Sequence, residues 1–239
     1  MDFQNKTIGE IVAKDYRTAR VFKSYGLDFC CGGKRNLLVA CTEKGIDFKA
    51  LEQELSVLQA IPSTLQNNYR DWSTDFLLDY ITNKHHAYVR KHIPPITAFS
   101  EKVARVHGQL HPETIAIFHS WTELSEELIS HLLKEEKIVF PAIKNLTARS
   151  EKSLSLTTLE KIGAPLQMME TEHERAGDLM RHIRQLSNNY TPPEGACTTY
   201  RILFQMLEEF EADLHEHVHL ENNVLFPRIE ELRKNIPLI

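Results

Sequence analysis

The sequence has no hydrophobic run long enough to span a lipid bilayer, no signal-peptide pattern in residues 1–13 and no cluster of basic residues. A net charge of −5 over 239 residues, without a basic run, argues against nucleic acid or a membrane surface as the main partner. The four cysteines, two of them adjacent, do not resemble the framework of a disulfide-rich secreted protein. These absences predict a soluble globular protein of the cytoplasm.

Alternation of polar and apolar residues, which is typical of β-strands, is missing from residue 73 onward, and the pattern there is helical throughout. Four long helices are predicted, approximately over residues 74–92, 112–146, 154–186 and 197–232. Pro94-Pro95 is expected to kink or break the first of them. Four long helices with short connections predict an all-α, up-down-up-down four-helix bundle.

A smaller helical domain is predicted before the bundle. Residues 1–60 have the pattern of short helices, with Thr7 and Asp47 at positions suited to N-caps and Gly45 at the end of one helix. Residues 61–72 are mostly polar and include a proline, so we interpret them as a linker. The predicted domains are therefore 1–60 and 73–239, joined by 61–72.

One motif, His-x-x-x-Glu-x-x-x-x-Phe-Pro, occurs twice, at residues 131–141 and 217–227. On a helix, positions i and i+4 share a face, so His131 lies beside Glu135 and His217 beside Glu221. A single His-x-x-x-Glu is typical of an exposed ion pair. Both copies, however, interrupt apolar stripes, which for the first copy run from Leu124 to Ile138, and buried ionisable groups are costly unless they are paired or bind metal. The repeat therefore favours a carboxylate-bridged dinuclear metal site inside the bundle.

Two further ligands are expected from the other helices. The apolar stripe of the third helix passes through His173, and the first helix offers either His85 or His86, between which periodicity does not decide. His107 lies 21 residues after His86, about 31 Å along a straight helix, and would reach the site only through a sharp turn. The remaining histidines are interpreted as surface or capping residues: His92, His111, His119, His182, His215 and His219.

Carboxylates and imidazoles without a thiolate suit iron or manganese better than structural zinc. Glu135 and Glu221 would bridge two metal ions, and His131, His173, His217 and a histidine of the first helix would be terminal ligands. Six protein ligands do not saturate two octahedral ions, so exchangeable positions would remain for water, O₂ or NO.

The bundle resembles a hemerythrin-like domain, and the whole chain resembles the di-iron iron–sulfur cluster repair proteins, the RIC family of YtfE and ScdA type. The resemblance is carried in chain order by these motifs: Thr7-Ile-Gly-Glu, Asp28-Phe-Cys-Cys-Gly-Gly33, His85-His86, His131-x-x-x-Glu135-Glu, Glu172-His173-Glu, Pro192-Pro-Glu-Gly-Ala-Cys-Thr-Thr199 and His217-x-x-x-Glu221-Asn-Asn-Val-Leu-Phe-Pro227. It selects His86 rather than His85 as a ligand.

The resemblance implies two non-haem iron ions with carboxylate and oxo bridges. It also implies a cytoplasmic homodimer that restores iron–sulfur proteins damaged by nitric oxide or peroxide. Iron donation and NO handling, including an enzymatic reduction of NO, are both compatible with it. Oxygen-carrying hemerythrins have two histidines one turn apart on the third helix, whereas Met169 and Gly177 flank His173 here. That departure favours small-molecule chemistry or iron transfer over reversible O₂ carriage.

Two other functions remain as alternatives. A hemerythrin-type sensor or carrier of O₂ or NO would use the same ligands. A ferritin-like oxidase is disfavoured, because its signature is Glu-x-x-His rather than His-x-x-x-Glu.

Cys30 and Cys31 form a second candidate site. They precede two glycines and an expected helix start, where a helix dipole and Lys34 favour the thiolate. In the context of the family, this pair is expected to have a redox or iron-handling role. Cys41 is interpreted as a core residue and Cys197 as a structural residue at the start of the last helix.

Overall fold

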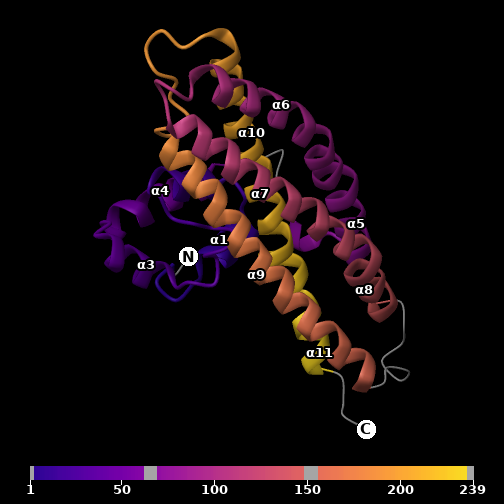
Figure 1. Ribbon diagram of the computed structural model, residues 1–239. Coiled ribbons are helices and arrows are strands. Elements are labelled where there is room, and N and C mark those ends of the chain that lie inside the picture. Colours follow the sequence, from indigo (N-terminus) through magenta and orange to yellow (C-terminus); the bar gives the residue numbers. More distant parts are fainter. Residues whose placement is uncertain (1–2, 62–68, 148–155, 236–239) are drawn as a thin grey trace. The chain divides into compact units, whose positions relative to one another are not determined.

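The computed structural model describes residues 3–61, 69–147 and 156–235 (Figure 1). Every named element in these ranges is a helix, which confirms the all-α prediction. The chain divides into two compact units: Met1–Leu77 with Glu216–Ile239 form unit 1, and Leu78–His215 form unit 2. The domain boundaries expected from the sequence stay a prediction, and residues 62–68 of the expected linker lie outside the described residues.

Unit 1 begins with short helices that are fixed by their caps. They are α1 (Ile8–Lys14), α2 (Thr18–Ser24), α3 (Leu37–Lys44) and α4 (Phe48–Ala60), followed by the single turn η1 (Tyr69–Asp71). Thr7 caps α1 in a capping box with Glu10, and the Asp47 side chain accepts hydrogen bonds at the start of α4. Both predicted N-caps are therefore confirmed. Gly45 ends α3 with φ of 65°, a conformation that glycine adopts without strain.

The C-terminal part of unit 1 contains the end of α10 (Thr198–Leu220), the π-helical turn η5 (Glu221–Leu225) and α11 (Phe226–Asn235). Asn223 of η5 donates hydrogen bonds to the carbonyl oxygens of Phe29 (3.1 Å) and Cys30 (3.3 Å). A Cβ atom at Gly9 would lie 2.0 Å from Oδ1 of Asn223, and one at Gly33 would lie 2.3 Å from it. Glycine at position 9 allows α1 to pack this closely on η5, and glycine at position 33 does the same for the loop that carries Cys30 and Cys31.

Unit 2 is built from long helices that run lengthwise in Figure 1. In chain order the elements of unit 2 are the end of α5 (Thr74–Tyr80), η2 (Ile81–His86), α6 (Ala87–His107), α7 (Glu113–Lys134), η3 (Glu135–Val139), α8 (Phe140–Thr147), α9 (Leu156–Leu186) and the first part of α10. Helix α7 packs against both α6 and α9. The ring of Phe210 on α10 contacts Tyr88 of α6 and Trp121 of α7. The helices α6, α7, α9 and α10 are therefore packed together in unit 2.

Helix α6 continues through Pro94 and Pro95, so the break expected there does not occur. Each proline removes an N–H donor, which leaves the carbonyl four residues earlier, at Arg90 or Lys91, without its helical partner. Both of these residues are exposed, so water can replace the lost donors. The helix therefore reaches His107 uninterrupted.

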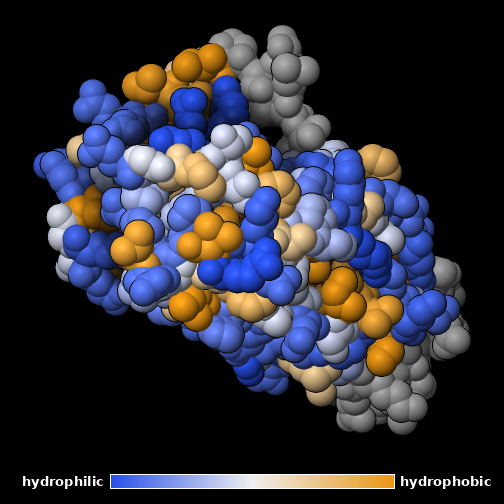
Figure 2. Space-filling view, turned by 45° about the horizontal axis from the view of Figure 1, so that its top comes forward, coloured by the Kyte–Doolittle hydropathy of each residue, from blue (hydrophilic) through white to orange (hydrophobic). Residues whose placement is uncertain are grey.

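Hydrophobic side chains on the surface form small groups among hydrophilic residues on the face shown in Figure 2. Leu110 and Val106 are among the most exposed, at 84% and 61%. Small scattered groups of this kind are ordinary on protein surfaces. No helix among the described residues combines the length and the apolar character that crossing a membrane requires.

Candidate metal centre

Both carboxylates of the duplicated motif begin a π-helical turn. Glu135 opens η3 and Glu221 opens η5, and in each turn a backbone N–H five residues on, from Phe140 or Phe226, donates to the glutamate carbonyl. His86 ends the third such turn, η2. Turns of this type are rare and occur frequently at functional sites. Three predicted ligands, His86, Glu135 and Glu221, therefore lie in π-helical turns rather than in regular α-helix.

The Phe-Pro pair after each glutamate gives a local reason for two of these turns. In a regular α-helix, the ring of Pro141 or Pro227 would clash with the carbonyl four residues earlier. A wider turn immediately before the proline moves that carbonyl away. The extra residue also shifts the apolar stripe, so that Val139 and Ile143 are buried while Ile138 is 58% exposed. Our prediction that Ile138 continues the buried stripe is therefore wrong.

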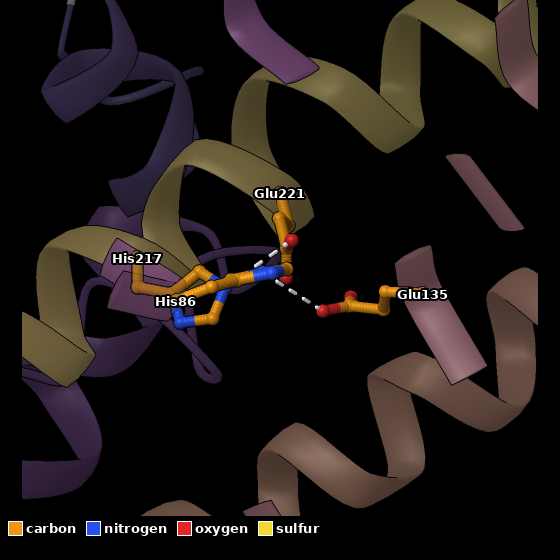
Figure 3. Close-up of side chains that lie close together, drawn as sticks. All are labelled: His86, Glu135, His217 and Glu221. Atoms are coloured by element: carbon orange, nitrogen blue, oxygen red, sulfur yellow. Dashed lines mark ion pairs between the residues drawn. The ribbon is translucent and has the colours of Figure 1, made fainter. Parts of the chain in front are cut away.

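In unit 2, four predicted ligands come together and are buried. Nε2 of His86 lies 3.2 Å from Oε2 of Glu135, and Nε2 of His131 lies 3.2 Å from Oε1 of the same carboxylate (Figure 3 shows the first pair). Nε2 of His173 lies 3.0 Å from Nε2 of His131. Donor atoms of His131, Glu135 and His173 all lie within 4.8 Å of one another. One buried carboxylate thus faces two imidazoles from different helices.

In unit 1, the second copy of the motif forms the same contact. Nε2 of His217 lies 3.3 Å from Oε1 of Glu221, with exposures of 1% and 0% for the two side chains (Figure 3). The predicted i, i+4 pairing is therefore present in both copies. His219, which we interpreted as a surface or capping residue, is instead fully buried, and that burial lowers its pKa to about 3. The His219 ring packs against Tyr16 and Phe29 of the N-terminal segment.

Each of two imidazoles has a second carboxylate at its other nitrogen. Nδ1 of His86 donates to Glu136 at 2.8 Å, and Nδ1 of His131 donates to Glu172 at 2.7 Å. The hydrogen bond from His131 lowers the pKa of Glu172 to about 2. Partial burial opposes a lower pKa at Glu136, but hydrogen bonds from Arg90 and His86 lower it nevertheless. Our sequence analysis missed both glutamates, although each is the neighbour in sequence of a predicted ligand.

The donor set of unit 2 fits a cation. The N–H group at Nδ1 of His131 donates a hydrogen bond to Glu172, so a neutral ring has its lone pair at Nε2. That lone pair faces the carboxylate of Glu135 and Nε2 of His173, so acceptors face acceptors unless a proton or a metal ion lies between them. Nitrogen and oxygen donors without sulfur suit iron or manganese. Cys197, the one cysteine in the sequence of this unit, contacts His107 instead.

The structure distinguishes the competing histidines of the first helix. Both His85 and His86 are buried, but Nδ1 of His85 lies 3.1 Å from Oδ1 of Asp213, whereas His86 faces Glu135. His107 lies at the end of α6, where its Nε2 is 3.3 Å from Sγ of Cys197. It therefore lies apart from the ligands of unit 2, as the straight-helix argument predicted.

The cysteine pair differs from expectation in one respect. Helix α3 begins only at Leu37, so no helix N-terminus follows the cysteine loop directly. Cys30 is buried with its Sγ atom 3.8 Å from that of Cys31 and 3.2 Å from Oδ1 of Asp28. The hydrogen bond with Cys31, burial and the charge of Asp28 all raise the pKa of Cys30 well above its usual value. The expectation of a thiolate favoured by a helix dipole is therefore wrong for Cys30.

Two protein-family models match this chain, one after the other. Residues 4–59 match the ScdA_N family, described as a domain of unknown function, and residues 78–229 match the hemerythrin HHE cation-binding domain. The iron–sulfur cluster repair protein YtfE of Yersinia pestis (strain Pestoides F) is 37% identical over 228 residues, which are 95% of this chain and 98% of that protein. YtfE of Yersinia pseudotuberculosis serotype IB (strain PB1/+) is 36% identical over the same shares of both chains.

These identities extend over nearly the full length of this chain and of each relative. The chain therefore belongs to the YtfE family of iron–sulfur cluster repair proteins, with a hemerythrin-like cation-binding domain after an ScdA_N domain.

Proposed function

We propose that this protein repairs iron–sulfur clusters damaged by nitric oxide or peroxide, and that it does so through one dinuclear non-haem iron site. The observation that carries the proposal is the buried Glu135 carboxylate, which faces imidazole nitrogens from two different helices. A carboxylate with a separate nitrogen donor near each oxygen has the geometry of a bridge between two metal ions.

The second half of the site is assigned to His217 and Glu221. Asp213 of α10 contacts His85, the neighbour of His86, and His217 follows Asp213 by one helical turn on the same face of α10. The cation-binding family extends over residues 78–229 and so includes both motif copies. In this proposal Glu135 and Glu221 would bridge the two ions, and His86, His131, His173 and His217 would be terminal ligands.

Bound iron would supply exchangeable coordination positions and one-electron redox chemistry. The protein's own part is to hold the ligands in a dry interior, since all six residues are at most 3% exposed. On α9 the residue one turn before His173 is Met169, fully buried and apolar. With a single histidine on α9, the iron would have a coordination position that a small molecule such as NO or O₂ could occupy. One ligand fewer would also make release of the iron easier.

The partners follow from the same proposal. Damaged iron–sulfur proteins are the clients, NO and O₂ are the small molecules, and the protein acts as a homodimer in the cytoplasm. Cys30 and Cys31 take part in redox chemistry or iron handling, and both lie in the loop that Asn223 fastens to the turn carrying Glu221.

A repair assay tests this function. We expect iron-loaded protein to restore activity to an iron–sulfur dehydratase inactivated by nitric oxide, and metal-free protein to restore none. Ferrous iron added alone at the same concentration is the control. Equal repair by the metal-free protein would contradict the proposal. Loading with isotopically labelled iron separates the two routes, because iron donation places the label in the repaired cluster and NO handling does not.

A further inference from the structure

Two of the proposed ligand histidines form a hydrogen bond with a carboxylate at Nδ1, the ring nitrogen farther from Glu135. The ring of His86 directs Nε2 to Glu135 and Nδ1 to Glu136, and the ring of His131 directs Nε2 to Glu135 and Nδ1 to Glu172. Both imidazoles are almost fully buried, with exposures of 0% for His86 and 3% for His131. Each ring is therefore held at both nitrogens, and in both rings Nε2 is the nitrogen nearer the bridging carboxylate.

Each of the two carboxylates that contact these rings is the direct neighbour in sequence of another proposed ligand. Glu136 directly follows Glu135, and Glu172 directly precedes His173. Each ligand on one helix thus has a neighbour that reaches a ligand on another helix: Glu136 of η3 contacts the ring at the end of η2, and Glu172 of α9 contacts the ring on α7. The dipeptides Glu135-Glu136 and Glu172-His173 therefore connect ligands on η2, η3, α7 and α9 to one another.

Each carboxylate is itself held by a cation. A guanidinium nitrogen of Arg90 lies 2.8 Å from Oε1 of Glu136, and the ammonium group of Lys134 contacts Oε1 of Glu172. Arg90 lies one turn after His86, and Lys134 lies three residues after His131. The cation that holds each carboxylate therefore comes from the same helix as the histidine that the carboxylate supports. The arrangement of histidine, carboxylate and cation occurs twice in unit 2.

We propose that Glu136 and Glu172 are positioning residues for the metal centre: each fixes a proton on Nδ1 of its histidine and so keeps Nε2 as the metal-binding nitrogen. An ionised carboxylate can only accept a hydrogen bond, so its partner nitrogen must carry the proton. The other nitrogen of a neutral ring is then a lone pair with a fixed direction. Partners of this kind increase the basicity of a ligating histidine, and their loss typically lowers metal affinity 10- to 100-fold.

This inference rests on the proposed metal site but can fail separately from it. Ion pairs that only stabilise the bundle would have the same distances, and their removal would weaken the metal-free fold without a specific effect on metal. A positioning role predicts the opposite pattern. The metal-free protein should keep its fold, while metal affinity and the Nδ1–H protons of the ligand rings should change.

Cobalt binding to the full-length metal-free protein tests the proposal. Co²⁺ is titrated against a competing chelator, and proton NMR in water detects the hyperfine-shifted exchangeable Nδ1–H signals. The variants are Glu136→Ala and Glu172→Ala. The matched controls are Glu126→Ala, an exposed glutamate on α7, and Glu174→Ala, an exposed glutamate on the other side of His173. Circular dichroism of each metal-free protein reports the fold.

We expect the two test variants to bind Co²⁺ about 10- to 100-fold more weakly, each with loss of one shifted N–H signal, while both controls match the wild type. Glu172→Gln should lose less affinity and keep the signal, because its amide oxygen still accepts the Nδ1 proton. If Glu172→Ala fails to fold, Glu136→Ala decides. Unchanged affinity and unchanged N–H signals in the folded Ala variants would overturn the positioning role. Failure of the wild type to bind Co²⁺ would instead overturn the proposed metal site itself.

Discussion

Nε2 of His107 lies 3.3 Å from Sγ of Cys197, and its ring contacts Tyr200. His107 ends α6, whereas His86 lies immediately before its first residue, 21 positions earlier. The intervening helix, at about 1.5 Å per residue, separates the two histidines by about 31 Å. Two histidines on one helix thus have unrelated environments.

His107→Ala should therefore keep the full iron content, whereas His86→Ala should lose at least half of it. The reason is that, of these two histidines, His86 faces the Glu135 carboxylate and His107 does not. Iron bound per chain, measured on proteins purified in parallel, checks the prediction. Loss of iron in the His107 variant alone would contradict the assignment of ligands.

The cysteine pair should act in repair without binding the iron of the bundle. A Cys30→Ser/Cys31→Ser double variant should keep its fold and its iron spectrum, because the proposed ligands are only imidazoles and carboxylates. It should lose most of its ability to restore an NO-damaged iron–sulfur enzyme, while still binding NO. Full repair activity would remove the thiols from the mechanism, and loss of the iron spectrum would make a cysteine a ligand.

Close packing at Gly9 should make this position intolerant of any side chain. A Cβ atom there would lie 2.0 Å from Oδ1 of Asn223, so Gly9→Ala should destabilise the protein by about 1–3 kcal/mol through overpacking. Urea unfolding measures this. Asn223→Ala removes the nearest clashing atoms, so the double variant should be less destabilised than the sum of the two single variants. Strictly additive losses of stability would mean that the side chains at positions 9 and 223 are not in contact.

Stability at high pH should depend on Tyr200. Burial, together with Glu113, raises the pKa of Tyr200 to about 12, above its ordinary value of 10.0. A group whose pKa is higher in the folded state contributes its stability below the unfolded pKa and loses it as pH rises, here between pH 10 and 12. Tyr200→Phe should therefore lose less stability over that range, by about 1 kcal/mol. Urea midpoints at pH 8 and pH 11 test this, and parallel losses in both proteins would contradict it.

The i, i+4 spacing predicted the contact between histidine and glutamate in both motif copies, because each His-x-x-x-Glu segment is regular helix up to its glutamate. His131 and His217 lie in α7 and α10, and the wide turns begin only at Glu135 and Glu221. The contact between histidine and carboxylate within each motif therefore follows from helix geometry alone.

The π-helical turns were not predictable from periodicity, because one extra residue in a turn changes which residues of the following helix face the core. For this reason Ile138 is exposed where the stripe predicted burial. The wide turn η2 likewise explains why periodicity did not decide between His85 and His86, which are both buried. Glu136 and Glu172 were missed because a polar residue beside a ligand has the pattern of an ordinary exposed position.

The central claim is that Glu135 and Glu221 bridge two iron ions in one site. Iron analysis with an optical spectrum, on wild type, Glu135→Ala, Glu221→Ala and the control Glu126→Ala, tests it most directly. We predict two irons per chain in the wild type and the control, and less than half that content in either bridge variant. Thermal stability should fall with the iron, because metal binding is linked to folding. Two irons and an unchanged spectrum in both bridge variants would contradict the claim.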